Sequence, residues 1–206
     1  MTGHAGREAM LAGCHAIVLA AGGASRFGGG KLLARLDDTP LVCRAVRAAF
    51  AAPVESVRVV IGADAEQVRE AVLAAQTPPP EFVHCDSWQQ GLSASLKAGI
   101  GALPADARAV AIFLGDMPDL SGQLAGEALR AVLGGAPAAY PVFGQAPGHP
   151  VALSRALFEG VAQLEGDRGA RALIKDHPGV VRLPVDDPGC IVDIDTRDDL
   201  RVYARA

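Results

Sequence analysis

Apolar runs and amphipathic stretches alternate along most of the chain, and this alternation restricts the fold more than any other feature. Apolar runs typical of buried strands occupy residues 16–20, 57–61 and 109–114, and a shorter strand is expected at 81–85. Apolar residues at helical spacing follow these runs, at 42–50, 68–75, about 92–101 and 124–132. Repeated strand and helix units predict an α/β protein with a mostly parallel central sheet flanked by helices.

The length of the chain suits one domain. With 206 residues, 50% of them hydrophobic, it can form one well-buried core. We expect a single domain over residues 15–206, preceded by a flexible N-terminus over residues 1–14. The apolar run near the N-terminus is too short for a signal peptide, and the sequence has no apolar stretch of 18 residues. The sequence therefore predicts a cytoplasmic protein with no membrane partner.

Charge and cysteine spacing exclude other classes of protein. The net charge of −4 at pH 7 argues against nucleic acid as a partner, because nucleic-acid-binding domains present a basic surface. A small anionic ligand needs only a local positive pocket. Four scattered cysteines, with no C-x-x-C pair, make a zinc site improbable and are typical of reduced thiols.

A glycine-rich loop directly follows the first apolar run. Gly22, Gly23 and the glycines at 28–30 can take positive φ angles and let backbone N–H groups approach a ligand closely. Arg26 and Lys31 add two positive charges, so that a phosphate group fits the loop. A surface turn, in which the glycines merely permit tight folding, is the alternative interpretation.

The loop matches neither of two common phosphate-binding motifs. Counting back from Lys31, a P-loop requires glycine where Ser25 stands, and Leu32 takes the place of its Ser or Thr. A dinucleotide fingerprint requires glycine where Ala24 or Ser25 stands. The loop therefore predicts a phosphate cradle of another kind.

Acidic residues near the ends of strands indicate a metal–nucleotide complex. Asp116 follows the apolar run 109–114, and Asp193 and Asp195 lie on one face if their segment is a strand. Mg²⁺ is usually held by one or two carboxylates together with phosphate oxygens. Asp116 as the cap of a turn and Asp195 as the N-cap of the last helix are the structural alternatives.

Motifs at three places resemble the signatures of nucleotidyltransferases with a GT-A-like, Rossmann-like fold: L-A-A-G-G-A-S-R-F-G at 19–28, G-D-M-P at 115–118, and D-I-D-T at 193–196. Segments 88–96, 148–150 and 164–171 resemble the molybdenum cofactor cytidylyltransferase branch of the MobA-like NTP transferase family. The resemblance extends from about residue 15 to 203. It implies transfer of a nucleoside monophosphate to a phosphorylated acceptor, most simply a molybdopterin, with release of pyrophosphate. Alanine at position 21, rather than glycine, implies CTP as the donor.

The resemblance also implies roles for individual residues. Catalytic roles fall to Arg26, Lys31 and Asp116, and the Mg²⁺ ligands would be Asp116 and Asp195, with Asp193 as the rival. The expected nucleotide contacts are Ala20, Ala21, Gly22, Gly23, Ser25, Arg26, Lys31, Gln90, Gly91 and Ser95. The expected acceptor contacts are His149, Asp167 and Arg168.

Structural roles compete with several of these assignments. Ser93 and Ser95 can cap a helix, and His149 can be an ordinary loop residue. Segment 167–171 can begin an anion-binding helix or a capped surface helix. Trp88 is expected to pack in its loop.

Two other classes of function remain open. A Rossmann-type oxidoreductase is disfavoured by the missing G-x-G-x-x-G fingerprint and by the paired aspartates. A chaperone that inserts a cofactor would share the binding residues without catalysis. Beside the nucleotide and the acceptor, a molybdoenzyme or its maturation factor is the protein partner that the resemblance implies.

Overall fold

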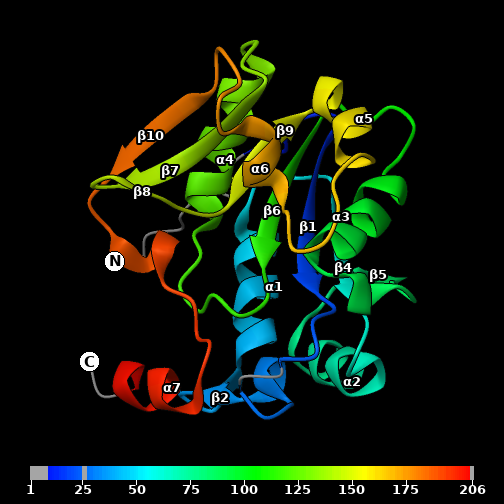
Figure 1. Cartoon of the computed structure of the whole chain (residues 1–206), viewed down its shortest axis with the longest axis vertical. Helices are drawn as coiled ribbons and strands as arrows, with labels where there is room; N and C mark the ends of the chain where they lie inside the picture. Colours follow the sequence, from blue (N-terminus) through cyan, green and yellow to red (C-terminus); the bar gives the residue numbers. More distant parts are fainter. Residues whose placement is uncertain (1–8, 25–26, 205–206) are drawn as a thin grey trace.

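A mostly parallel sheet runs through the molecule, with helices on both faces (Figure 1). The computed structural model describes residues 9–24 and 27–204. The eight-stranded sheet has the order β10-β7-β9-β6-β1-β4-β5, with β8 paired to β7. Its strands are β1 (Cys14–Ala20), β4 (Ser56–Ile61), β5 (Glu81–His84), β6 (Ala109–Leu114), β7 (Ala138–Phe143), β8 (Ala146–Pro147), β9 (Val151–Ser154) and β10 (Val181–Val185).

The strand directions confirm the predicted fold class. β1 pairs in parallel with both β4 and β6, β4 with β5, and β7 with β10. β9 runs antiparallel between β6 and β7, and β8 runs antiparallel to β7. Because two antiparallel pairings separate β7 from β6, these two strands point the same way. The carboxyl ends of β1, β6 and β7 therefore lie toward one edge of the sheet.

Helices connect the strands. They are α1 (Leu41–Ala51), α2 (Ala65–Ala75), α3 (Leu92–Gly101), α4 (Gly122–Leu133), α5 (Phe158–Val161), α6 (Ala170–Ile174) and α7 (Arg197–Tyr203). Short 3-10 turns are η1 (Lys31–Leu33), η2 (Trp88–Gln90), η3 (Arg155–Leu157) and η4 (Pro188–Ile191), and a small hairpin joins β2 (Arg35–Leu36) to β3 (Thr39–Pro40). The four predicted strands and the four predicted helices up to residue 133 are all present.

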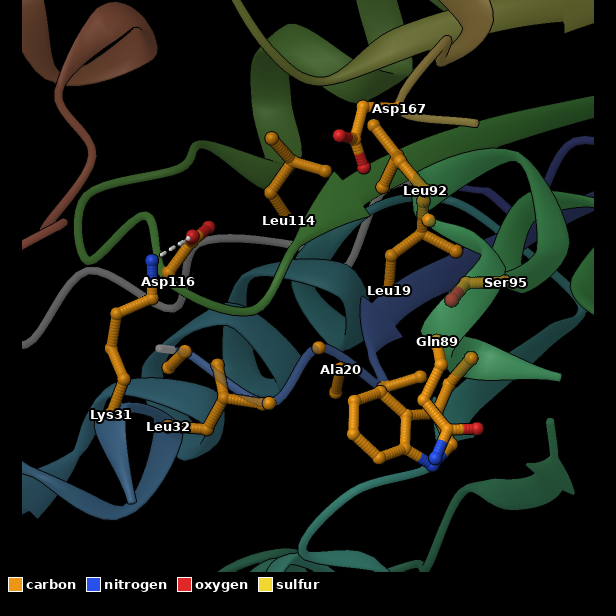
Figure 2. Close-up of a pocket in the computed structure, with 16 residues that line it drawn as sticks. Leu19, Ala20, Lys31, Leu32, Gln89, Leu92, Ser95, Leu114, Asp116 and Asp167 are labelled. Carbon is orange, nitrogen blue, oxygen red and sulfur yellow. Dashed lines mark hydrogen bonds and ion pairs between the residues drawn. The ribbon is translucent and has the colours of Figure 1, made fainter. Parts of the chain in front are cut away.

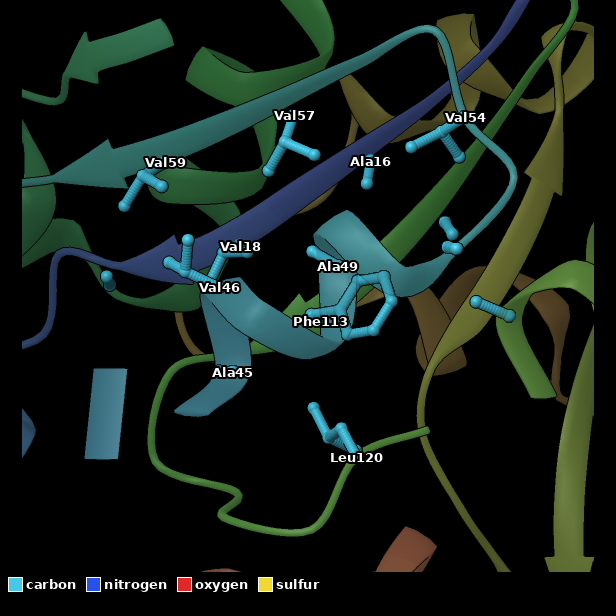
Figure 3. Close-up of a cluster of buried hydrophobic side chains, with 14 of the residues drawn as sticks. Ala16, Val18, Ala45, Val46, Ala49, Val54, Val57, Val59, Phe113 and Leu120 are labelled. Carbon is cyan, nitrogen blue, oxygen red and sulfur yellow. The ribbon is translucent and has the colours of Figure 1, made fainter. Parts of the chain in front are cut away.

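Strand β1 is buried throughout because its side chains alternate between two cores. Ala16 and Val18 join a cluster with α1, α2 and α4, whereas Ile17 and Leu19 join a cluster with α3, α5 and α6. In Figure 3, side chains of α1 pack against β1 in the first of these clusters. Each large apolar side chain buried in this way contributes about 1.5–3 kcal/mol. The central strand is thereby held in place between the two cores.

The segment after η4 is extended but pairs with no strand, contrary to the strand expected at 192–196. Ile194 is 1% exposed and packs in a third cluster with Phe27, Leu36 and Leu41. Its backbone N–H donates to the carbonyl of Asp116 at 3.1 Å. Figure 1 shows α7 and β2 together below the arrowheads of β1 and β6. The C-terminal segment is therefore fixed beside the carboxyl ends of the central strands.

The ends of two predicted elements differ in detail. Apolar helical spacing was found from residue 42, and α1 begins at Leu41 after Pro40, while Thr39 pairs in β3. Strand β1 begins at Cys14, and the N–H of Leu11 donates to the carbonyl of Pro53 at 2.9 Å. Residues 1–8 of the predicted flexible N-terminus lie outside the described residues. In the part of the chain that the structure describes, no helix is long and apolar enough to span a bilayer.

Candidate active site

A cavity of about 570 Å³ opens where the chain leaves β1 and β6. We call it the main cavity. Ligands of open α/β sheets bind at such places, because loops after neighbouring strands diverge there. The lining consists of Leu19, Ala20, Ala21, Gly22, Gly23, Ala24, Lys31, Leu32, Trp88, Gln89, Gly91, Leu92, Ser95, Leu114, Asp116 and Asp167. Three segments distant in sequence thus line one cavity.

The glycine-rich loop forms one wall and differs from the prediction in one respect. The glycines at 28–30 have φ angles of +86°, +88° and +64°, whereas Gly22 and Gly23 do not adopt positive φ. Gly22 has open space where a Cβ would lie, and both glycines line the cavity. The predicted contacts of Ser25 and Arg26 fall outside the described residues. Left-handed backbone at 28–30 leads directly into η1, which begins with Lys31.

Lys31 joins two acidic side chains across the sequence. Its Nζ donates to Asp116 Oδ2 at 2.7 Å and to Asp195 Oδ1 at 3.0 Å (Figure 2 shows the Asp116 contact). The lysine side chain is 11% exposed, and the carboxylates are 24% and 42% exposed. Burial alone would lower the pKa of Lys31, but the charges and hydrogen bonds of Asp116 and Asp195 outweigh it and raise that pKa. The ammonium therefore stays charged and holds the two carboxylates together.

Backbone hydrogen bonds place both carboxylates. The N–H of Gly115 donates to Leu19 at 2.9 Å, which extends the β1–β6 pairing to the residue before Asp116. The bond from Ile194 to the carbonyl of Asp116 then brings Asp195 alongside. The position of Asp195 therefore depends on the backbone hydrogen bond of its buried neighbour, Ile194.

Neither aspartate caps a helix. Helix α4 begins at Gly122 with Ser121 as its N-cap. Helix α7 is capped by Thr196, whose hydroxyl accepts from Asp199 N–H while the Asp199 carboxylate accepts from Thr196 N–H. The alternative that made Asp195 the N-cap of the last helix is therefore wrong.

Asp193 lies at the exposed rim of the same cluster. Partial burial, followed by the negative charges of Asp195 and Asp116, raises the pKa of its carboxyl. The two side-chain contacts of Lys31 go to Asp116 and Asp195. The geometry therefore favours Asp195 over Asp193 as the partner of Asp116.

The donor set fits a hard divalent cation that also binds phosphate. Within residues 9–24 and 27–204, no group of three or more His, Cys, Asp or Glu side chains gathers as a metal site. Asp116 and Asp195 provide oxygen donors from two carboxylates, and phosphate oxygens and water complete the coordination of such ions. Oxygen ligands suit Mg²⁺ or Mn²⁺ better than Zn²⁺.

The opposite wall comes from η2 and the start of α3, and Figure 2 shows Gln89 and Ser95 there. The Trp88 ring packs against Gly23 so closely that a Cβ on this glycine would lie 2.9 Å from it. Gln90 does not line the main cavity but a neighbouring hollow with Ser93. The prediction named Gln90, and the tight 3-10 turn instead presents Gln89. Ser93 lies inside α3, whose N-cap is Gly91.

Gly91 ties this wall to the segment before α6. Its φ is +100°, and a Cβ there would lie 2.6 Å from the Gly166 carbonyl and 2.7 Å from Asp167 Oδ1. The N–H of Ser93 donates to the carbonyl of Gly166 at 3.0 Å. This close approach brings Asp167 into the lining of the main cavity. Arg168 is exposed and outside that lining.

His149 is buried away from the main cavity. Its side chain is not part of the lining, and its backbone N–H donates to Cys190 at 2.7 Å. Burial and the nearby positive charge of Arg171 lower the pKa of His149 to about 3, although a backbone hydrogen bond with Ile112 opposes this. The imidazole is therefore neutral at pH 7, and its position does not favour the predicted contact with the acceptor.

The comparison that decides the family concerns most of the chain. Residues 16–181 match the model of the MobA-like NTP transferase domain. The chain belongs to the MobA-like NTP transferase family. No curated protein matches it. The resemblance to the MobA-like NTP transferase family is thereby confirmed.

Solved structures share the MobA-like fold over nearly their whole length. A homolog of Rv0371c from Mycobacterium sp. strain JC1 is 30% identical, covers 94% of this chain and 96% of its own, and has a TM-score of 0.79. Rv0371c from Mycobacterium tuberculosis H37Rv, in complex with manganese, is 26% identical, with coverages of 94% and 98% and a TM-score of 0.76. Molybdopterin-guanine dinucleotide biosynthesis protein A from Archaeoglobus fulgidus is 17% identical, with coverages of 93% and 97% and a TM-score of 0.68.

Family membership supports an enzyme of the nucleotidyltransferase type. In this MobA-like chain the sequence motifs located the glycine loop, Lys31 and the two carboxylates. The motifs missed the apolar part of the cavity, to which Leu32, Leu92 and Leu114 contribute. Leu114 ends the apolar run 109–114, and its position at the carboxyl end of a strand was the available signal.

Proposed function

We propose that the chain transfers CMP from CTP to the phosphate of a molybdopterin-type acceptor and releases pyrophosphate. The observation that carries the proposal is the cluster of Lys31, Asp116 and Asp195, of which Lys31 and Asp116 line the main cavity. A cation between two carboxylates, next to a left-handed glycine loop, suits the binding of a metal–triphosphate complex.

The reaction needs positioning and charge neutralisation more than proton transfer. A phosphate oxygen of the acceptor forms a bond to the α-phosphorus of CTP, and the bond between that phosphorus and the bridging oxygen of pyrophosphate breaks. The attacking oxygen is already anionic, so no strong general base is required. Mg²⁺, when bound, would supply charge stabilisation at the α-phosphate.

The residues of this chain would divide the remaining work. Asp116 and Asp195 would hold the metal, and Lys31 would neutralise the triphosphate and the leaving pyrophosphate. The glycine loop and the opposite wall, formed by η2 with Gln89 and by the start of α3, would enclose the nucleoside from two sides. We also propose that Arg26 adds positive charge beside the phosphates, as the resemblance of its motif implies.

The choice of CTP and of a molybdopterin acceptor rests on sequence motifs. Ala21 implies cytidylyl transfer, and its carbonyl is already engaged by the N–H of Ala63 at 3.1 Å. A Cβ on Gly62 would lie 2.8 Å from the Ala21 Cβ, so the position is closely packed. The modified acceptor would then pass to a molybdoenzyme or to its maturation factor.

Product analysis tests the proposal directly. The protein is incubated with molybdopterin, Mg²⁺ and each of the four nucleoside triphosphates, and pyrophosphate and the mass of the product are measured. Formation of a CMP adduct with stoichiometric pyrophosphate supports the function. Binding of molybdopterin without pyrophosphate release in any mixture would favour a non-catalytic chaperone, and Asp116→Asn serves as the inactive control.

A further inference from the structure

A second cavity of about 770 Å³ is lined by residues of α6, β7, β8 and β10. Figure 1 shows where these elements lie. It shares no lining residue with the main cavity. The residues at the carboxyl ends of β7 and β10 line it, among them Val142 and Val185. Its volume falls within the range of about 300–1,000 Å³ that is typical of small-molecule sites.

Positive charge gathers in this cavity although the chain as a whole has a net charge of −4. Arg171, Lys175 and Arg182 line it, against the single acidic side chain of Asp186. Among the residues that the structure describes, none of the three cations forms an ion pair. Cations that line a cavity without forming an ion pair favour the binding of an anion from outside the chain.

Hydrogen bonding leaves donors of this cluster available. Arg182 Nε donates to the Tyr140 hydroxyl at 3.1 Å. Arg171 Nε is buried and has no hydrogen-bond partner within the described part of the chain. A buried donor without a partner destabilises the folded state, and an anionic ligand that accepts its hydrogen bond would offset this.

The rest of the lining is apolar and includes one aromatic ring. Val142, Ile174 and Pro184 contribute aliphatic surface, and Tyr140 adds its ring. A free phosphate ion would leave this surface uncovered. The lining therefore fits an anion attached to a ring system that can pack against it.

Backbone hydrogen bonds connect the surroundings of the second cavity with the active cluster. Pro147 of β8 lines the second cavity, and the N–H of His149, two residues further on, donates to the carbonyl of Cys190 in η4 at 2.7 Å. At the other end of the same segment, the N–H of Ile194 donates to the carbonyl of Asp116 at 3.1 Å. The segment from η4 to Asp195 therefore contacts residues next to both sites.

We propose that the second cavity binds the distal part of the acceptor, an anionic group on a planar ring system, while the reactive phosphate lies at the cluster of Lys31, Asp116 and Asp195. This inference rests on the proposed function, since it names a further subsite for the same substrate. Arg171, Lys175 and Arg182 would supply the charge, and Tyr140 would contact the ring.

The aromatic composition of the chain allows each cavity to be observed separately. The chain has two tyrosines, Tyr140 in the second cavity and Tyr203 on α7, and its one tryptophan, Trp88, lines the main cavity. Labelling with 3-fluorotyrosine gives two ¹⁹F signals, of which Tyr203 is the internal control. Trp88 fluorescence reports Mg²⁺–CTP in the main cavity.

The probe is 1-naphthyl phosphate, with 1-naphthol and inorganic phosphate as matched controls. The Tyr140 signal should shift with increasing 1-naphthyl phosphate while the Tyr203 signal stays in place. Arg171→Gln and Lys175→Gln should each raise the apparent Kd at least about tenfold, whereas Arg47→Gln, at an exposed position on α1, should not change it. Both 1-naphthol and inorganic phosphate should bind more weakly than 1-naphthyl phosphate.

The outcomes separate this inference from the function on which it rests. If Trp88 fluorescence responds to Mg²⁺–CTP but 1-naphthyl phosphate does not shift the Tyr140 signal, the acceptor subsite is overturned and the proposed nucleotidyl transfer is unaffected. A probe-induced Tyr140 shift that is equal in Arg171→Gln overturns it as well. A selective Tyr140 shift without any Trp88 response supports the anion cavity and contradicts CTP as the donor.

Discussion

Lys31 and Asp116 are 85 residues apart in the sequence, yet 2.7 Å separates their Nζ and Oδ2 atoms. The same ammonium lies 3.0 Å from Asp195 Oδ1. A divalent cation that binds both carboxylates must share or replace this ammonium, which would then be free to neutralise phosphate. The lysine therefore serves as the counter-ion of the two carboxylates when no metal–nucleotide complex is bound.

Lys31→Ala should lower turnover by about 10²- to 10³-fold, because one preorganised charge is lost from the site. The variant also leaves Asp116 and Asp195 without their shared counter-ion, so its Tm should fall in EDTA and recover with Mg²⁺. Steady-state kinetics and melting curves check both effects. An unchanged turnover with a normal melting curve would show that the glycine loop is only a turn.

Asp116→Asn should abolish metal-dependent transfer, because the amide keeps the size of the side chain but removes the charge that binds the cation. Asp195→Asn should be more damaging than Asp193→Asn, since Asp195 contacts Lys31. Activity is measured across titrations of Mg²⁺ and Mn²⁺. A larger loss from Asp193→Asn would mean that the rim carboxylate is the second ligand.

CTP should have a higher kcat/KM than GTP, as alanine at position 21 implies. Ala21→Gly should then weaken this discrimination without unfolding the chain, because only one methyl group is removed. Competition between the two nucleotides in one reaction mixture gives the ratio directly. Equal values, or a preference for GTP, would contradict the proposed donor.

Gly91→Ala should destabilise the protein by about 1–3 kcal/mol, because a non-glycine residue is strained at this positive φ and its Cβ would collide with Gly166. Activity should fall too, because η2 and the start of α3 would move away from Gly166 and Asp167. Denaturant unfolding measures the change. Gly101→Ala serves as the control, because Gly101 is the last residue of α3, the helix that Gly91 precedes, and has open space where a Cβ would lie. This variant should be nearly neutral, and equal losses of stability in both variants would refute the explanation.

Acidification should destabilise the native state through His149. Burial lowers the pKa of its imidazole from 6.5 to about 3, so between these values the unfolded chain binds a proton that the folded chain does not. Its contribution to stability is complete above about pH 6.5 and is lost as the pH falls toward 3, with a slope of up to about 1.4 kcal/mol per pH unit. His149→Gln should flatten the dependence of unfolding free energy on pH over this range. His15, whose pKa burial and Arg58 also lower, is expected to contribute to the slope that remains.

The sequence predicted those elements whose residues carry their own periodicity. Strand β1 and helix α1 are examples, because the alternation and spacing of their apolar residues suffice to define them. The part after residue 133 was not predicted, since strands β7 and β10 contain Pro141 and Pro184 and gain their pairing from distant segments. An antiparallel strand such as β9 inside a parallel region has no local signal.

The site was predicted as a set of residues but not as a set of contacts. Motif spacing brought Lys31, Asp116 and Asp195 to one edge of the sheet. It did not indicate that the lysine would bond both carboxylates, because that depends on the contact of Ile194 with Asp116. The orientation of η2, which exposes Gln89 instead of Gln90, depends on backbone geometry that the sequence pattern does not encode.

The backbone bond between Ile194 and Asp116 also sets an order of events during synthesis of the chain. Asp195 follows Lys31 by 164 residues, so the glycine loop and the central strands emerge from the ribosome long before the second carboxylate does. Until then Lys31 has only Asp116 as a partner in this cluster. The cluster of one lysine and two carboxylates is therefore complete only after the C-terminal segment has been synthesised and has docked against Asp116.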